Sequence, residues 1–103
     1  MNYSFHPEAE AEFLGAIDFY EEHKENLGLD FAAEVYAAIT RAAEHPRAWP
    51  LVQGEIRRCQ TTRFPYGVLY SQEPDGIFIL AVMHLHRDPD YWKHRIEQMS
   101  QRQ

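Results

Sequence analysis

The sequence is poor in the features that crosslink a chain or hold it in a membrane. Cys59 is the only cysteine, so the chain forms no internal disulfide, and we predict a reducing, cytoplasmic setting. No apolar run approaches the roughly 20 residues of a membrane-spanning helix. The first residues, MNYSFHPEAEAEF, lack the basic start and apolar stretch of a signal peptide. A secreted or membrane-bound protein is therefore not expected.

Positive charge is also scarce. Ten Lys and Arg residues stand against 16 Asp and Glu residues, which gives a net charge of −6. Residues 1–50 carry ten acids and three bases, a net −7, whereas residues 51–103 carry six acids and seven bases, a net +1. This balance argues against a protein that holds nucleic acid mainly through its phosphates, because such binding needs many cations. A local arginine-rich surface in the second half stays open.

The sequence does contain enough apolar residues for one core. Hydrophobic residues make up 45% of the chain and aromatic residues 14%, so we expect a single folded domain spanning residues 1–103. The first element is predicted to be a short strand, NYSF, at residues 2–5.

The single thiol, Cys59, alternates with charged neighbours and has no activating partner nearby in the sequence, so we expect it to be inert.

Two helices are predicted to follow and to form a hairpin. Pro7 suits the first turn of the first helix, and we expect Gly28 to end it. Its apolar residues recur at helical spacing and include Phe13, Ile17 and Tyr20. The apolar stripe of the second helix comprises Phe31, Val35, Ala38, Ile39 and Ala42. The two prolines of HPRAWP end the second helix. Because the connection between the two helices, near Gly28, is so short, we expect the helices to be antiparallel neighbours.

The spacing of apolar residues changes after residue 54. EIRRCQTTRF (55–64) and VLYSQ (68–72) predict neighbouring strands, and EPDG (73–76) contains the residues of a tight turn. IFILAVMH (77–84) is the most continuous apolar run in the chain. We therefore predict that it is the central strand, covered on both faces.

The last segment, DPDYWKHRIEQM (88–99), predicts a helix with Asp88 as its N-cap and Pro89 at its first position. The predicted fold class is α+β. It consists of an N-terminal strand, an αα-hairpin packed on an antiparallel meander sheet of about four strands, and a C-terminal helix.

Four segments together resemble one known family. They are FHPEAEAEF leading into AIDFY, then GLDF, then RRCQTTRFPYGVLY, and finally AVMHLHRDPDYW. They resemble the RelE/ParE superfamily of bacterial type II toxins, and more closely its ParE-like plasmid stabilisation branch. The resemblance implies the fold predicted above and a small toxin with no cofactor. It also implies a cognate antitoxin, ParD-like or similar, that holds the toxin inactive in a hetero-oligomer.

The resemblance leaves three functions open, because the superfamily divides by target. The ParE branch inhibits DNA gyrase, which is the function we expect. A second branch cleaves mRNA on the ribosome; here Arg63, His84 and Tyr91, with Arg58, would be the catalytic candidates. That branch commonly carries a basic residue after the tyrosine of its third strand, where this sequence has Gly67. The third possibility is an inactive paralogue that only binds antitoxin.

Two binding surfaces are predicted on this basis. Arg, Tyr and Trp are the usual anchors of protein interfaces. The candidates for contact with the target are Arg58, Arg63, His84, Arg87, Tyr91 and Trp92. The candidates for contact with the antitoxin, on the αα-hairpin, are Phe13, Leu14, Ile17, Val35 and Ile39. His84 and His86 point to one side of a strand, but a zinc site needs a third ligand, so we expect no metal.

Overall fold

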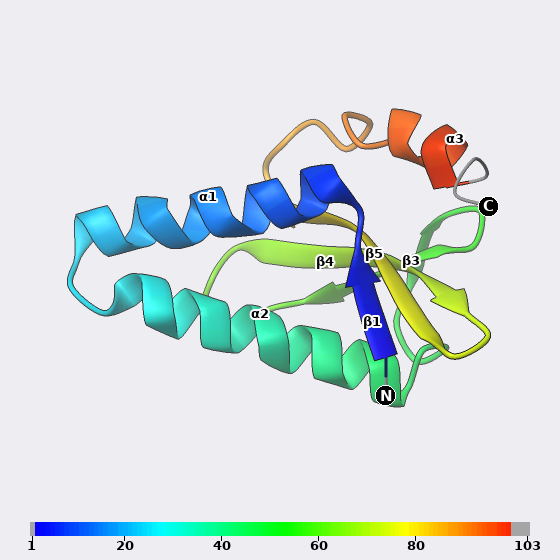
Figure 1. Cartoon of the computed structure of the whole chain (residues 1–103), viewed down its shortest axis with the longest axis horizontal. Helices are drawn as coiled ribbons and strands as arrows, with labels where there is room; N and C mark the ends of the chain where they lie inside the picture. The colour runs from blue at the N-terminus through cyan, green and yellow to red at the C-terminus, as the bar shows by residue number, and fades with distance from the viewer. Residues whose placement is uncertain (1, 100–103) are drawn as a thin grey trace.

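The computed structural model describes residues 2–99 as three helices and one five-stranded sheet (Figure 1). The elements in chain order are β1 (Asn2–Phe5), α1 (Pro7–His23), α2 (Leu27–Glu44), β2 (Leu51–Gln53), β3 (Ile56–Gln60), β4 (Tyr66–Glu73), β5 (Gly76–His84) and α3 (His94–Met99). The strand order across the sheet is β1-β5-β4-β3-β2. The predicted α+β class, with a helical hairpin on a sheet and a C-terminal helix, is confirmed.

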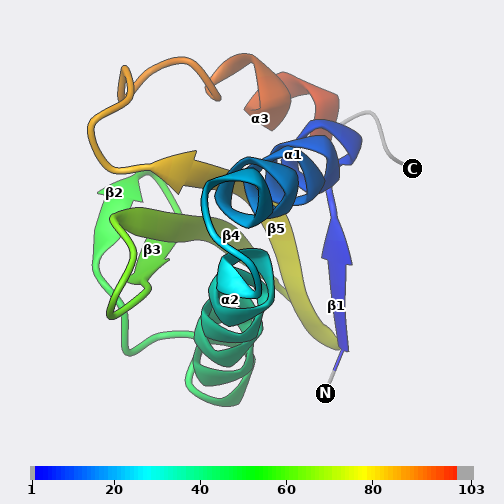
Figure 2. The same ribbon diagram turned by 90° about the vertical axis from the view of Figure 1, so that its left-hand side faces the viewer.

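The sheet is mixed, because the predicted strand at residues 2–5 joins it in parallel, and it contains one strand, β2, that was not predicted. β3, β4 and β5 form the antiparallel meander, with β5 buried along almost its whole length as predicted. β1 pairs with β5 in parallel, from Asn2 opposite Gly76 to Phe5 opposite Ile79. The short strand β2 pairs with β3 at the other edge. Figure 2 shows β1 and β2 on opposite sides of the molecule, with α1 and α2 seen nearly end-on between them.

The αα-hairpin covers one face of the sheet, and its predicted apolar stripes form the main core. Phe13 of α1 and the five predicted residues of α2 are buried there. The turn differs from the prediction. α1 ends at His23, Asn26 takes the left-handed conformation (φ 70°), and Gly28 lies inside the first turn of α2. A Cβ on Gly28 would lie 2.6 Å from the Ile17 carbonyl oxygen, so this glycine is needed for the close approach of the helices.

The other face of the sheet packs against the C-terminal segment. A second apolar cluster there includes Leu69, Leu80, Met83 and Trp92. The predicted helix over 88–99 is shorter in the structure, because the Asp88 carboxylate accepts a hydrogen bond from the Asp90 N–H and caps a turn. α3 begins only at His94. Likewise the predicted strand 55–64 ends at Gln60, since the next five residues form a loop bound by side chains of the loop itself and of α2.

Candidate functional site

The polar centre of the molecule is the carboxylate of Glu12 on α1. It accepts hydrogen bonds from both terminal nitrogens of Arg95, at 2.9 and 3.1 Å, and from the Tyr91 hydroxyl. It also accepts the backbone N–H of Val82 in β5 at 3.2 Å. The side chain of Glu12 is 14% exposed and that of Arg95 is 4% exposed. This is a nearly buried, bidentate ion pair that joins α1 to the C-terminal segment.

The ion pair has a structural reason at the edge of β5. β1 accompanies β5 only as far as Ile79, after which the chain leaves the sheet and starts α1. Beyond that point no described strand lies beside β5 on this side. Arg95 donates to the Leu80 carbonyl oxygen at 3.0 Å, and Glu12 accepts from Val82, so two charged side chains satisfy the backbone where a strand would otherwise do so.

Two arginines flank the ring of Tyr91. The guanidinium carbon of Arg87 lies 3.7 Å from the ring centroid, and that of Arg95 lies 5.1 Å from it. Arg87 also approaches the Glu12 carboxylate at 3.7 Å while its side chain stays 54% exposed. Burial, followed by the hydrogen bond and charge of Glu12, raises the pKa of the Tyr91 hydroxyl. Tyr91 is therefore a protonated, immobilised platform that presents the Arg87 guanidinium to solvent.

A cleft of about 260 Å³ opens beside this platform, between α1 and the end of β5. Gly15 and Phe19 form its α1 side, and Tyr66, His84 and Arg87 form the opposite side. The His84 ring meets the Tyr66 ring edge-on at 5.4 Å, and its Nδ1 accepts the His86 N–H at 3.1 Å. Burial is the main cause that raises the pKa of Tyr66. The cleft thus offers an exposed cation and aromatic surface to a partner.

The six residues predicted to contact a target lie in three places. His84 and Arg87 line the cleft, and the Tyr91 ring lies against Arg87. Arg63 lies in the loop after β3, where its guanidinium is 3.7 Å from Asp30 of α2 and its N–H donates to Glu34. The other two, Arg58 and Trp92, lie on the sheet face opposite the hairpin, and Trp92 is only 3% exposed.

The residues predicted to bind an antitoxin divide in a similar way. Phe13, Val35 and Ile39 lie in the core, each at most 2% exposed. Leu14 is 56% exposed, and Ile17 is half-buried. Three exposed apolar side chains of the same hairpin were not among the predicted contacts, namely Phe19 at 54%, Leu29 at 65% and Tyr36 at 46%. Their positions between the buried stripe residues were the available signal.

Glu12 and Arg95, the ion pair at the centre, were also missed. Each lies one helical turn from another member of the same polar network, because Glu12 follows Glu8 and Arg95 follows Tyr91 by four residues. Glu8 reaches His94 at 3.2 Å and Arg95 at 3.7 Å. The four-residue spacings were the only signal in the sequence, because the two segments that form the network are more than 80 residues apart.

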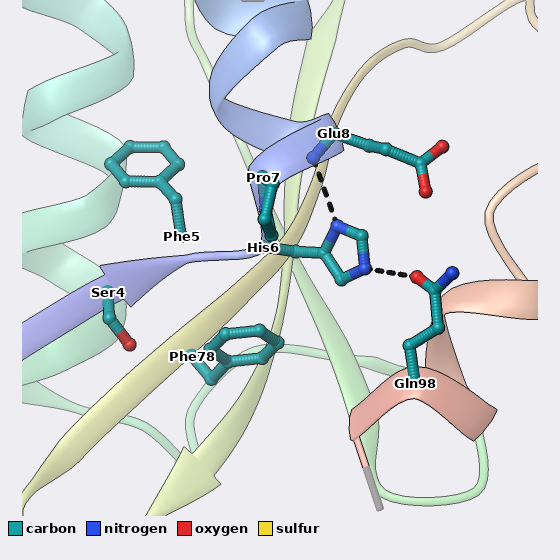
Figure 3. Close-up of a pocket in the computed structure, with 7 residues that line it drawn as sticks. All are labelled: Ser4, Phe5, His6, Pro7, Glu8, Phe78 and Gln98. Carbon is teal, nitrogen blue, oxygen red and sulfur yellow. Dashed lines mark hydrogen bonds between the residues drawn. The ribbon is translucent and has the colours of Figure 1, made fainter. Parts of the chain in front are cut away.

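The start of α1 is tied to the last helix through His6. Its Nδ1 accepts the Glu8 N–H at 3.0 Å and so caps α1, and its Nε2 therefore carries the proton that is donated to Gln98 (Figure 3). His6 is 6% exposed and lines a hollow of about 610 Å³ together with Phe78. Figure 3 shows His6 lying between the two elements, with both of its hydrogen bonds drawn.

Neither a metal cluster nor a membrane span is found in the part of the chain that the structure describes. No three His, Cys, Asp or Glu side chains there are grouped to hold an ion. No helix there is long and apolar enough to cross a bilayer.

A helical hairpin on a mixed sheet defines a small α+β protein, and this one carries exposed apolar and cationic surfaces. The chain belongs to the ParE toxin family: the family model described as the ParE toxin of the type II toxin–antitoxin system parDE matches residues 3–89. A solved structure titled "Chromosomal ParDE TA system from P. aeruginosa" has a similar fold, with a TM-score of 0.70 and 16% identity. The match covers 84% of this chain and 97% of that one. No curated protein matches.

Proposed function

We propose that this protein is a toxin that inhibits DNA gyrase by binding it, and that a cognate antitoxin neutralises it in a hetero-oligomer. The family supplies the toxin class. The observation that favours gyrase over RNA cleavage concerns Arg63, His84 and Tyr91, the candidates for cleavage: among the described residues no hydrogen bond, ion pair or ring contact joins any two of them. A gyrase target also places the toxin in the cytoplasm.

Metal-free RNA cleavage needs a base for the 2′-hydroxyl, an acid for the leaving oxygen and cations for the phosphate, all within hydrogen-bond reach of the same atoms. The Tyr91 hydroxyl is bound to Glu12, and its raised pKa makes it a poor acid. Arg63 contacts Asp30 of α2 instead of facing His84. A binding surface needs no such convergence, and the exposed Arg87 on its aromatic platform suits one.

The test compares two targets with the same purified, antitoxin-free protein. One reaction contains gyrase and supercoiled plasmid, and the other contains translating ribosomes with a defined mRNA. Trapped, cleaved plasmid with intact mRNA is the expected result. Cut mRNA with untouched plasmid would overturn the proposal in favour of the ribonuclease, and no effect in either reaction from folded protein would indicate an inactive, antitoxin-binding paralogue.

Two variants separate binding from acid–base chemistry. Tyr91→Phe keeps the ring beneath Arg87 but removes the hydroxyl, so gyrase inhibition should persist whereas an RNA-cleaving role for that hydroxyl would be lost. Arg87→Gln should weaken gyrase inhibition about tenfold or more, because it removes the exposed cation. Arg47→Gln, an exposed arginine outside the cleft, is the matched control and should behave like the unaltered toxin.

The antitoxin surface follows from the exposed residues of the hairpin. Leu14, Leu29 and Tyr36 offer apolar contacts to an amphipathic helix, and Ala33 and Ala37 beside them allow it to approach. The first half of the chain carries a net −7, which suits a partly basic partner segment. Leu14→Lys should therefore weaken antitoxin binding, whereas the same change at Leu51, which is also 56% exposed but lies on β2, should not.

The charge part of this proposal has its own test. Affinity between toxin and antitoxin is measured across a series of salt concentrations. The affinity should fall as salt rises, because screening weakens the attraction between the acidic hairpin and a basic segment. An affinity that does not depend on salt would contradict the charge argument but leave the apolar contacts in place.

A further inference from the structure

Arg58 differs from the other arginines that the structure describes. Residues 2–99 contain seven arginines. The guanidinium groups of six of them form a hydrogen bond or an ion pair with a carbonyl oxygen, an amide or a carboxylate of the protein. For Arg58, on β3, there is no hydrogen bond or ion pair from the guanidinium to any described residue, although the side chain is half-buried. A partly desolvated guanidinium without a counter-charge is unfavourable for the fold alone.

The position of the Arg58 side chain is set by a missing side chain on the next strand. A Cβ on Gly67 would lie 2.9 Å from Cδ and 3.0 Å from Cγ of Arg58, so the stem of the arginine lies across this glycine. The absence of a side chain at Gly67 thus leaves the space in which the Arg58 side chain crosses the sheet. The guanidinium is carried to the face opposite the αα-hairpin, where Leu69 and Met83 form part of the second apolar cluster.

Arg58 lines a cleft of about 120 Å³ on that face, which we name the Arg58 cleft. Its lining is completed by Val52, Gln53, Leu69, Met83, Pro89, Asp90, Trp92 and Lys93. Arg58, Asp90 and Lys93 are the charged side chains of the cleft. Lys93 pairs with Asp90 at 2.7 Å, so their charges cancel and one uncompensated positive charge, that of Arg58, is left. The cleft is therefore matched to a single negative group.

We propose that the Arg58 cleft binds one carboxylate side chain of the toxin's protein target, held by the guanidinium of Arg58. The geometry of the group favours this ligand, because a guanidinium donates two parallel hydrogen bonds to a carboxylate. The volume is that of roughly four water molecules and fits one such group. Nucleic acid is disfavoured, because a run of phosphates would meet a protein of net charge −6 with a single free cation here.

The apolar surroundings specify the partner further. Val52 is 38% exposed within the cleft, and Leu51 beside it on the edge strand β2 is 56% exposed. The partner segment therefore carries an acidic residue next to an apolar one. Because the cleft and the αα-hairpin lie on opposite faces of the sheet, this contact is separate from the proposed antitoxin surface. The inference rests on the proposed function in taking gyrase as the protein that supplies the acid.

The first experiment measures binding of purified gyrase by unaltered toxin, by Arg58→Gln and by the control Arg47→Gln. Arg58→Gln should bind about 30-fold more weakly or worse, the loss typical of an interface anchor, with most of the change in the dissociation rate. Its melting temperature should not fall, because the guanidinium has no described partner in the fold. Equal binding by Arg58→Gln and Arg47→Gln, or a lowered melting temperature with unchanged binding, would overturn the inference.

A second experiment does not depend on gyrase. The peptide acetyl-Leu-Glu-amide is titrated into ¹⁵N-labelled toxin at low salt, with acetyl-Leu-Gln-amide as its uncharged match. The Arg58 Nε–H and Gly67 N–H resonances should respond to the glutamate peptide only. No response, an equal response to both peptides, or plasmid DNA binding that disappears in Arg58→Gln would overturn the carboxylate assignment. If the peptide binds but unaltered toxin neither binds nor inhibits gyrase, the proposed function fails while the cleft chemistry stands.

Discussion

Replacing Glu12 with alanine should be among the most destabilising single changes in this protein. The carboxylate accepts four hydrogen bonds, from Arg95 twice, from Tyr91 and from Val82. Its loss leaves the Arg95 charge, with 4% of the side chain exposed, without its main counter-ion. Removing one partner of a buried ion pair costs about 3–5 kcal/mol. Glu8 lies 3.7 Å from Arg95 and retains part of the compensation, so we expect a loss of about 3–4 kcal/mol.

Urea unfolding followed by circular dichroism measures this loss directly. At about 4–8 °C per kcal/mol for a domain of this size, the melting temperature should fall by roughly 12–32 °C. Glu10→Ala is the matched control, because Glu10 lies on the same helix but is exposed, and it should change stability by less than about 0.5 kcal/mol. A loss below about 1 kcal/mol for Glu12→Ala would refute the argument that this ion pair holds α1 to the C-terminal segment.

Three further predictions concern other parts of the fold. Gly28→Ala should lower the free energy of unfolding in urea by about 1–3 kcal/mol, because its Cβ would clash with the Ile17 carbonyl. Gly15→Ala, with nothing within 4 Å of its Cβ, should raise that free energy by about 0.5–1 kcal/mol. A gain at both positions would contradict the close approach of the helices at Gly28. Burial acts to raise the pKa of Glu34, but the N–H groups of Arg63 and Thr62 and the Thr62 hydroxyl outweigh it, so the pKa is lowered. Glu34 should therefore hold the loop 61–65 in place at pH values above the pKa of Glu34 in the unfolded chain. The loop should loosen as pH falls from about 5 to about 3, and its amide hydrogens should then exchange faster; unchanged exchange would contradict this. Cys59 is fully buried and burial raises the pKa of its thiol, so it should react with a disulfide reagent only on unfolding, and rapid native labelling would contradict the packing.

Local patterns account for the parts of the fold that the sequence predicts. The α2 stripe from Phe31 to Ala42 repeats at the helical period, so its buried face follows directly from the residue order. The apolar run 77–84 predicts a strand covered on both faces for the same reason, and β5 is buried throughout that run except at His84. Pro7 marks the start of α1, where its missing N–H has no partner to lose.

The parts that the sequence does not predict depend on distant or side-chain contacts. β2 is exposed at all three residues and has no alternation to mark it as a strand. The strand predicted over 55–64 is cut short because Thr61 donates to the Phe64 carbonyl oxygen and Glu34 binds the next two N–H groups. The parallel pairing of β1 depends on a partner more than 70 residues away.

In the candidate site too, local sequence patterns indicate the types of residue, whereas their grouping depends on distant contacts. The sequence analysis placed arginines and aromatics near residue 90 among the candidates, and their grouping in space depends on Glu12, which is 83 positions before Arg95. An alternating pattern also cannot tell a surface tryptophan from a core one, and Trp92 is in the core. Arg58 was among the predicted contacts, but its lack of a partner is visible only in three dimensions.

The pairing of β1 with the middle of the sheet has a consequence for the synthesis of this toxin. The first strand emerges from the ribosome long before the residues 76–79 that it must pair with, and the Glu12–Arg95 ion pair closes later still. Contacts between distant parts of a chain form slowly, and a nascent chain cannot make them until both ends are present. The growing polypeptide therefore cannot complete its sheet until residue 79 is made, nor its polar centre until Arg95 is added, and β1 stays unpaired in the meantime.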